Sequence, residues 1–251
     1  MTAIGTNAVL AAFVMFCRIG ACLMLMPGIS SPRIPANVRL FIAFAITLAL
    51  TPLFSGVIEK RLNDAAPTAL VLILFTELVI GALIGFLGRI FFGALETLGS
   101  AIATAIGLAS PLSTSTDESE PLPAITALIT LGATMLFFLT DLHWEVLRGL
   151  IDSYAAMPVS GEFNAQFSLV QVSDCLSKSF FLALRISSPF IVYSLIVNLA
   201  VGLAAKLTPQ IPIYFITAPG VIAGGLFLLY ATCKQFLELF TAGFSAWLST
   251  G

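Results

Sequence analysis

Apolar runs long enough to cross a lipid bilayer recur along the whole chain. The hydrocarbon core of a bilayer is about 30 Å thick, so a spanning helix needs about 20 mainly apolar residues. Such runs cover residues 8–26, 40–54, 65–88, 90–112, 121–140, 180–205 and 211–231. The third and fourth runs adjoin, and they form either one long kinked helix or a hairpin. The sequence therefore predicts six or seven membrane helices.

Composition points to the same class of protein. Hydrophobic residues make up 59% of the chain and charged residues only 10%, whereas soluble domains carry about 25% charged residues. In lipid the backbone must satisfy its own hydrogen bonds, which favours helices. We therefore predict an all-α, polytopic helical membrane protein, with long helical hairpins broken by Pro and Gly, as a single membrane domain over residues 1–251. The first basic residue, Arg18, lies inside an apolar run, so we expect that run to be retained rather than cleaved as a signal peptide.

The clearest break between apolar runs is the sequence NLAVGLAAKLTPQIP at residues 198–212. Proline has no backbone donor, so Pro209 and Pro212 predict that one helix stops, turns and gives way to another. The similar sequence SPRIP at residues 31–35 precedes another apolar run. Either this match is fortuitous or the chain has two helical units that each turn at a P-x-x-P break.

Five charged residues lie inside apolar runs, namely Arg18, Glu77, Arg89, Glu96 and Arg185. A charge at the centre of a bilayer costs about 3 kcal/mol or more, so these side chains need partners. They either form a proton or ion path, or pair across helix or subunit contacts and reach toward a boundary. We favour pairing, because three of the five are arginines, which do not titrate in proteins.

Small and aromatic residues indicate how the helices pack. Gly81 and Gly85 form a GxxxG spacing, which lets helix backbones approach closely. The chain also has 21 phenylalanines, which we expect to face lipid or neighbouring subunits. Basic residues flank the second apolar run on both sides, so the positive-inside rule gives no clear orientation.

Two polar segments interrupt the apolar pattern. Residues 109–123 read ASPLSTSTDESEPLP, and this segment is either a solvated connector or a functional loop. Residues 152–178 suggest an interfacial or partner-facing excursion. No nucleophile–base pair, phosphate-binding glycine loop or zinc-ligand spacing is present, so we expect no catalytic residues, no cofactor and no metal. The net charge of −2 does not indicate nucleic-acid binding.

Sequence motifs along nearly the whole chain resemble one family of membrane proteins. They are RIG at residues 18–20, MP at 26–27, ELVIG at 77–81, GL at 107–108, His143, SY at 153–154 and, most specifically, NLAVGL at 198–203 followed by PQ at 209–210. With these motifs the chain resembles the FliR family, the R subunits of type III export gates. It departs from the family pattern at Ile211, where Asn is typical, and at Leu142, where Gly is typical.

The resemblance implies a function and a set of partners. Members of the family assemble with P- and Q-type export-gate subunits in the bacterial inner membrane, within the flagellar basal body, and the B-type switch subunit is a further expected partner. The gate conducts unfolded protein substrates out of the cytoplasm. The resemblance also implies a P-subunit-like part at residues 1–178 and a Q-subunit-like part at 179–251. The expected partners are therefore these subunits, unfolded substrates and the lipid membrane, with no nucleic acid.

The resemblance assigns roles to two groups of residues. In the family, a loop of the R subunit contributes to a plug in the closed pore, and by position it corresponds to Gly107, Leu108, Pro111, Ser113, Asp117, Glu118, Glu120, Pro121 and Pro123. The second group is expected at helix breaks and assembly contacts, with Arg18, Glu77 and Arg185 buried against P and Q subunits: Arg18, Glu77, Gly81, Gly85, Arg185, Asn198, Gly202, Lys206, Pro209 and Gln210.

Other functions remain open from the residues alone. A virulence-type export-gate subunit belongs to the same family. A stand-alone secondary transporter would use helices broken near Pro209 and Pro219 as a substrate site at the membrane midplane. An intramembrane enzyme is disfavoured, because no nucleophile–base pair is apparent.

Overall fold

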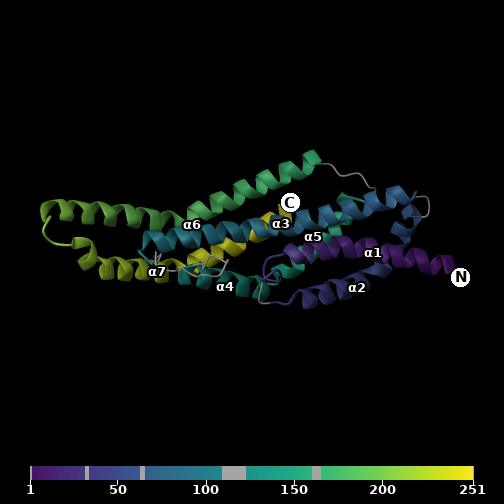
Figure 1. Cartoon of the computed structure of the whole chain (residues 1–251), viewed down its shortest axis with the longest axis horizontal. Helices are drawn as coiled ribbons and strands as arrows, with labels where there is room; N and C mark the ends of the chain where they lie inside the picture. Colours follow the sequence, from purple (N-terminus) through teal and green to yellow (C-terminus); the bar gives the residue numbers. More distant parts are fainter. Residues whose placement is uncertain (1, 32–33, 63–65, 109–122, 160–164, 251) are drawn as a thin grey trace. The chain divides into compact units, whose positions relative to one another are not determined.

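The computed structural model describes residues 2–31, 34–62, 66–108, 123–159 and 165–250 (Figure 1). Within these ranges the chain is helical and contains no strand. The helices are α1 (Thr2–Leu25), α2 (Ala36–Leu62), α3 (Pro67–Ala105), α4 (Ala124–Leu139), α5 (Leu142–Ala156), α6 (Ala165–Leu207) and α7 (Ile213–Thr250). Five of them are long and apolar enough to cross a membrane, or six spans if α4 and α5 count as one broken span. The predicted all-α, polytopic membrane fold is confirmed.

The structure decides one alternative that the sequence left open and shows the form of one polar segment. The adjoining runs 65–88 and 90–112 do not form a hairpin, because α3 continues through Gly88 and Arg89 as a single helix. A lone glycine costs a helix only about 1 kcal/mol, which packing readily offsets. The segment 152–178 is mostly helical rather than an excursion, since α5 extends to Ala156 and α6 begins at Ala165. Residues 165–178 contain neither Pro nor Gly, so nothing interrupts the start of α6.

Prolines act differently at different places. The predicted break at Pro209 and Pro212 is confirmed, because α6 ends at Leu207 and α7 begins at Ile213. In contrast, Pro219 lies inside α7, which continues past it, so the unwound helix that a transporter site would require there is absent from the described chain. A membrane helix tolerates a single proline where neighbouring groups satisfy the freed carbonyl.

The chain divides into two compact units. Unit 1 comprises residues 1–90 and 141–175, and unit 2 comprises residues 91–140 and 176–250. Helices α3 and α6 each contribute residues to both units. The likeness of residues 1–178 to a P subunit and of 179–251 to a Q subunit is a separate matter and stays a prediction.

In unit 1, α1 lies alongside α2 (Figure 1) and presents one buried stripe. The stripe repeats every three or four residues, as expected for one face of a helix. Its members are Ala11, Val14, Met15, Arg18, Ile19, Cys22, Leu23 and Met26. Every member except Arg18 is apolar, so this face places a single charge inside the unit.

The core of unit 2 is aromatic. Phe92 of α3 meets Phe137 of α4 and Phe240 of α7 edge to face, with ring centroids 6.0 and 5.4 Å apart. Phe244 of α7 joins the same cluster and is fully buried. Edge-to-face pairs of this kind stabilise a core beyond the area they bury. The expectation that the phenylalanines face lipid or other subunits is therefore wrong for these four.

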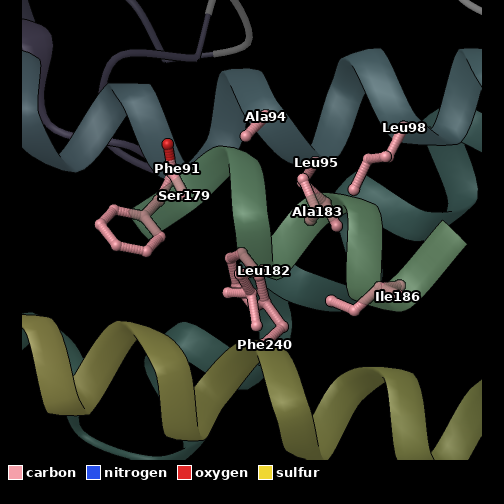
Figure 2. Close-up of a pocket in the computed structure, with 9 residues that line it drawn as sticks. All are labelled: Phe91, Ala94, Leu95, Leu98, Ser179, Leu182, Ala183, Ile186 and Phe240. Carbon is pink, nitrogen blue, oxygen red and sulfur yellow. The ribbon is translucent and has the colours of Figure 1, made fainter. Parts of the chain in front are cut away.

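Helices α3, α6 and α7 also pack closely within unit 2. Figure 2 shows Leu182 of α6 and Phe240 of α7 between their helices, with Ala94 and Leu95 of α3 lining the same space. That space holds only about 10 Å³, about enough for one water molecule. It is a packing defect rather than a ligand site.

Candidate functional site

A buried ion pair lies inside unit 1. Arg18 of α1 donates from Nε to Oε2 of Glu77 at 2.6 Å and from Nη2 to Oε1 at 2.7 Å. Arg18 is 0% exposed and Glu77 is 1% exposed. The two-point geometry matches the guanidinium fork to the carboxylate, which is the strongest arrangement for such a pair. These two charges are therefore neutralised within the chain.

The other groups around Arg18 come from the end of α5. Its Nη1 donates to Ser153 Oγ at 3.1 Å and its Nη2 donates to the carbonyl of Met157 at 2.9 Å. The guanidinium lies 4.1 Å from the ring centroid of Tyr154, a cation–π distance. Met157 caps the C-terminus of α5, so the cation meets the negative end of that helix.

The cluster around Arg18 thus joins four helices of unit 1. Helix α1 supplies Arg18, α3 supplies Glu77, and α5 supplies Ser153 and Tyr154. Helix α2 reaches it through Phe54, whose ring stacks on Tyr154 at 5.0 Å. We call these five residues the Arg18 cluster. Its chemistry is structural, because each nitrogen of Arg18 donates to a partner and the two charges are closed to solvent, whereas the buried hydroxyl of Tyr154 has no hydrogen-bond partner among the described residues.

The structure corrects one expectation and adds partners that sequence reasoning missed. Arg18 and Glu77 were expected to be buried against P and Q subunits, but they bury each other, because α1 and α3 pack together inside unit 1. The partners Ser153, Tyr154 and Phe54 were not identified. Two opposite charges, each alone in an apolar run, were a signal that they pair, since neither is tolerated singly in lipid.

Glycines allow α3 to lie directly on the backbone of α1. A Cβ at Gly81 would lie 2.0 Å from the carbonyl oxygen of Arg18. A Cβ at Gly85 would lie 2.5 Å from the carbonyl oxygen of Cys22. The close approach expected of the GxxxG spacing therefore occurs within the chain, and it brings Glu77, one turn before Gly81, against Arg18.

The expected plug loop begins at a well-defined helix end in unit 2. Gly107 has a positive φ of 77°. Its N–H donates to the carbonyl of Thr104 at 3.2 Å, and the N–H of Leu108 donates to the carbonyl of Ala103 at 2.8 Å. These two bonds make a Schellman cap, for which glycine is the favoured residue at the left-handed position. The end of α3 is thereby fixed up to Leu108.

Both ends of this loop start from one hydrophobic cluster. Leu108 before the loop and Ile125 after it pack against the buried side chains of Ile102, Ile106 and Phe190. Pro123 lies immediately before α4. The remaining expected plug residues, Pro111, Ser113, Asp117, Glu118, Glu120 and Pro121, lie outside the described residues.

The other expected assembly residues lie on the hairpin formed by α6 and α7. All of Lys206, Pro209 and Gln210 are exposed at its turn. Asn198 is exposed too, and its amide donates to Ser194 Oγ at 3.0 Å. A Cβ at Gly202 would meet nothing within 4 Å. Unlike Arg18 and Glu77, these residues are not buried by the chain itself.

Sequence reasoning also missed the contact that holds this hairpin together. Tyr193 of α6 donates its hydroxyl to the carbonyl of Val221 in α7 at 2.7 Å. A Cβ at Gly224 would lie 2.5 Å from that hydroxyl, and one at Gly225 would lie 2.4 Å from Ile106. The two glycines therefore let α7 approach both α6 and the end of α3.

Comparison with known proteins places the chain in a family. Residues 9–247 match the family described as bacterial export proteins, family 1. The chain belongs to this family. It is 30% identical over 233 residues to the flagellar biosynthetic protein FliR of Caulobacter vibrioides, covering 92% of this chain and 91% of that protein. It is 25% identical to FliR of Escherichia coli, covering 85% and 80%, and 27% identical to FliR of Aquifex aeolicus, covering 84% and 81%.

The site residues described above lie inside the part of the chain that matches the export family. The matched range includes the Arg18 cluster, the base of the loop at Gly107 and the hairpin turn at Pro209. The chain is thus a polytopic member of the bacterial export proteins with a closed ion pair in unit 1 and exposed polar positions on the hairpin of unit 2. The resemblance noted from the motifs is confirmed at the level of the family.

Proposed function

We propose that the chain is a non-enzymatic core component of the flagellar type III export gate. With P- and Q-type subunits in the bacterial inner membrane, at the flagellar basal body, it forms the channel for unfolded flagellar substrates. The B-type switch subunit is a further partner in this proposal. The loop between α3 and α4 contributes to a plug that obstructs the channel until a substrate displaces it.

The observation that carries the proposal is the extent of the similarity to FliR proteins. The match to the Caulobacter vibrioides protein covers 92% of this chain and 91% of that protein, so it extends over nearly the whole length of both rather than one segment. The chemistry of the described residues agrees with a structural role, because the buried side chains of Arg18 and Glu77 form a salt bridge with each other.

The geometry at the base of the loop supports the plug. Leu108 and Ile125 pack on the same buried cluster, and Gly107 ends α3 in a rigid cap. Because both ends of the loop are anchored, the segment between them can move out of a pore and return while the helices stay in place. The three acids Asp117, Glu118 and Glu120 make it a hydrated rather than an apolar obstruction.

Affinity purification from the native membrane tests the assembly. The chain, mildly solubilised with its own lipids, should bring down P- and Q-type subunits in one stable particle identified by mass spectrometry. Deletion of the gene should abolish swimming, and the wild-type gene should restore it. Recovery of a stable, monodisperse chain without these subunits would contradict the proposal.

Deletion of residues 113–120 tests the plug separately. The shortened chain should still co-purify with its partners, because the Gly107 cap and the Leu108–Ile125 cluster remain. Cells carrying it should leak ions through the gate. A matched replacement of residues 113–120 by a Gly/Ser segment of equal length separates loss of these side chains from loss of length. An ion-tight gate after the deletion would remove the plug assignment but not the assembly.

Two alternatives remain to be separated. A virulence-type gate subunit would restore effector secretion rather than swimming when expressed in the matching deletion strain. A stand-alone transporter would need charges around an open cavity, whereas Arg18 and Glu77 are 0% and 1% exposed. Substrate-dependent uptake into vesicles by the purified chain alone would favour the transporter.

A further inference from the structure

Arg185 of α6 is an exposed cation next to a long uncharged stretch of helix. The twenty residues 186–205 carry no charge, and Lys206 follows them. At 1.5 Å per residue these twenty residues extend about 30 Å, which is the thickness of a bilayer core. Their exposed side chains are apolar at Ile191, Leu195 and Leu199, among others. Arg185 and Lys206 therefore mark the two edges of a lipid-compatible segment.

Helix α7 repeats this arrangement on its side of the hairpin. Residues 213–233 are uncharged, extend about 32 Å, and end at Lys234. Lys234 precedes Gln235, which lines one groove together with Arg185. Arg185 precedes the apolar stretch of α6, and Lys234 follows the apolar stretch of α7. These two cations thus lie at the same level of the hairpin. Two helices independently place one bilayer edge at this level.

A polar groove of about 340 Å³ lies at that edge, between α6 and α7. Its lining residues are Arg185, Ile186, Ser188, Pro189, Thr232, Gln235, Phe236 and Leu239. Phe236 and Ile186 are buried and form its apolar floor, whereas Arg185 and Gln235 are exposed. The groove therefore combines an apolar base with a positively charged rim.

The charged group that remains free in this groove is a donor. Pro189 cannot donate to the carbonyl of Arg185, and the Ser188 hydroxyl donates to that carbonyl instead, at 2.9 Å. The Thr232 hydroxyl donates to the carbonyl of Leu228 at 2.8 Å. The guanidinium of Arg185 and the amide of Gln235 make no hydrogen bond to any described residue. The guanidinium of Arg185 can only donate and carries a positive charge, so it suits an anionic ligand with acceptor oxygens, to which the Gln235 amide can add one donor.

We propose that this groove binds the phosphate of an anionic membrane phospholipid. Arg185 holds the two non-bridging phosphate oxygens in its fork, Gln235 donates to one of the same oxygens, and the acyl chains lie along the exposed apolar stretch toward Lys206. Lys234 and Glu238 are exposed and lie 3.8 Å apart, so together they add no net charge beside the groove. A carboxylate on a partner helix has similar acceptors, but the position of Arg185 at the end of a 30 Å uncharged stretch matches the level of lipid phosphates. This inference stands apart from the proposed export function.

Native mass spectrometry of the full-length chain in detergent tests the proposal. The chain is mixed with equal amounts of phosphatidylglycerol and phosphatidylcholine with the same acyl chains, and the ratio of the two bound lipids is measured. Both lipids carry the same phosphate, but the choline cation of phosphatidylcholine neutralises it and would lie beside the Arg185 guanidinium, so phosphatidylglycerol should be favoured by about tenfold. R185Q should bring the ratio near one, and R185K, which keeps the charge but not the fork, should lie between.

Two further variants make the test specific. R148Q removes an exposed arginine of α5, outside the groove, and should leave the ratio unchanged. Q235L removes a donor without a change of charge and should lower the ratio partially. Each variant should elute as the wild type does, so that altered lipid binding is not misfolding.

Three results would overturn the proposal. The wild-type chain could show no preference for phosphatidylglycerol, R185Q could keep the full preference, or R148Q could lose as much as R185Q, which would reflect net charge alone. Loss of a co-purifying membrane protein in R185Q, without any lipid preference in the wild type, would assign Arg185 to an acidic partner residue instead. A chain that binds phosphatidylglycerol but does not support swimming would overturn the export function only.

Discussion

Replacing Glu77 by Gln should destabilise the chain strongly, because it leaves Arg18 charged and buried without a counter-charge. Arg18 makes four hydrogen bonds, two of them to Glu77. The neutral amide keeps at most one of these two as an acceptor. Removing one partner of a buried ion pair costs about 3–5 kcal/mol. For a chain of this size that corresponds to a decrease in Tm of about 10 °C.

The chain's own cysteines provide the assay. Cys22 and Cys175 are each 1% exposed and lie in unit 1, the unit that contains Glu77. A fluorogenic maleimide therefore reports the unfolding of unit 1 when the detergent-solubilised chain is heated. Cys233 is exposed and Cys17 is only partly buried, so both would react before unfolding, and the measurement uses a Cys17→Ala, Cys233→Ser background.

A double-mutant cycle separates the ion pair from the other contacts of Arg18. Arg18→Met alone and Glu77→Leu alone should each lower the Tm, since each leaves a buried polar group without its partner. The double variant should lose less than the sum of the two, because it removes both charges together. If Glu77→Gln lowered the Tm by less than about 2 °C, or the single losses simply added, the pair would not hold unit 1 together.

Three smaller changes test other contacts by thermal unfolding followed with circular dichroism, which covers both units, because Gly107 and Tyr193 lie in unit 2. Gly81→Ala should cost about 3 kcal/mol or more, because its Cβ would lie 2.0 Å from a backbone oxygen, whereas Gly93→Ala, with nothing within 4 Å, should be neutral or stabilising. Gly107→Ala should cost about 1–2 kcal/mol through strain at a φ of 77°, and unchanged stability would contradict the cap. Tyr193→Phe should cost about 1 kcal/mol, because it removes the hydrogen bond to the carbonyl of Val221. A loss of about 3 kcal/mol or more would indicate a wider rearrangement and would contradict this assignment.

The membrane fold could be predicted from the sequence because its signal is local. A run of about 20 apolar residues defines a spanning helix without reference to the rest of the chain. The break at Pro209 and Pro212 was equally accessible, since two prolines three residues apart leave few alternatives. The continuity of α3 through Gly88 was not accessible, because tertiary packing decides whether a helix bends or stops at a glycine.

The candidate site could be predicted only in part, because its contacts join distant segments. Arg18 and Glu77 were identifiable as charges in need of partners, but 59 residues separate them, and each had several candidates of opposite charge. The contribution of Tyr154 depends on the exact end of α5, which no local pattern reveals. Burial of Phe92 and its neighbours likewise depends on which helix faces meet. The number of phenylalanines does not show which of them point into the protein.

The described charges of the two units have different physical roles, and this decides how variants should be interpreted. The charge of Arg18 is cancelled inside unit 1, so a variant at this position that stops export acts through folding. The charge of Arg185 is exposed, and no described residue of the chain cancels it, so R185Q can change binding without loss of stability. Thermal unfolding followed with circular dichroism, which covers both units, separates these cases, because only the Arg18 variant should unfold early. An export defect in R185Q with an unchanged Tm would therefore show that Arg185 acts by binding a lipid or a partner protein rather than by stabilising the chain.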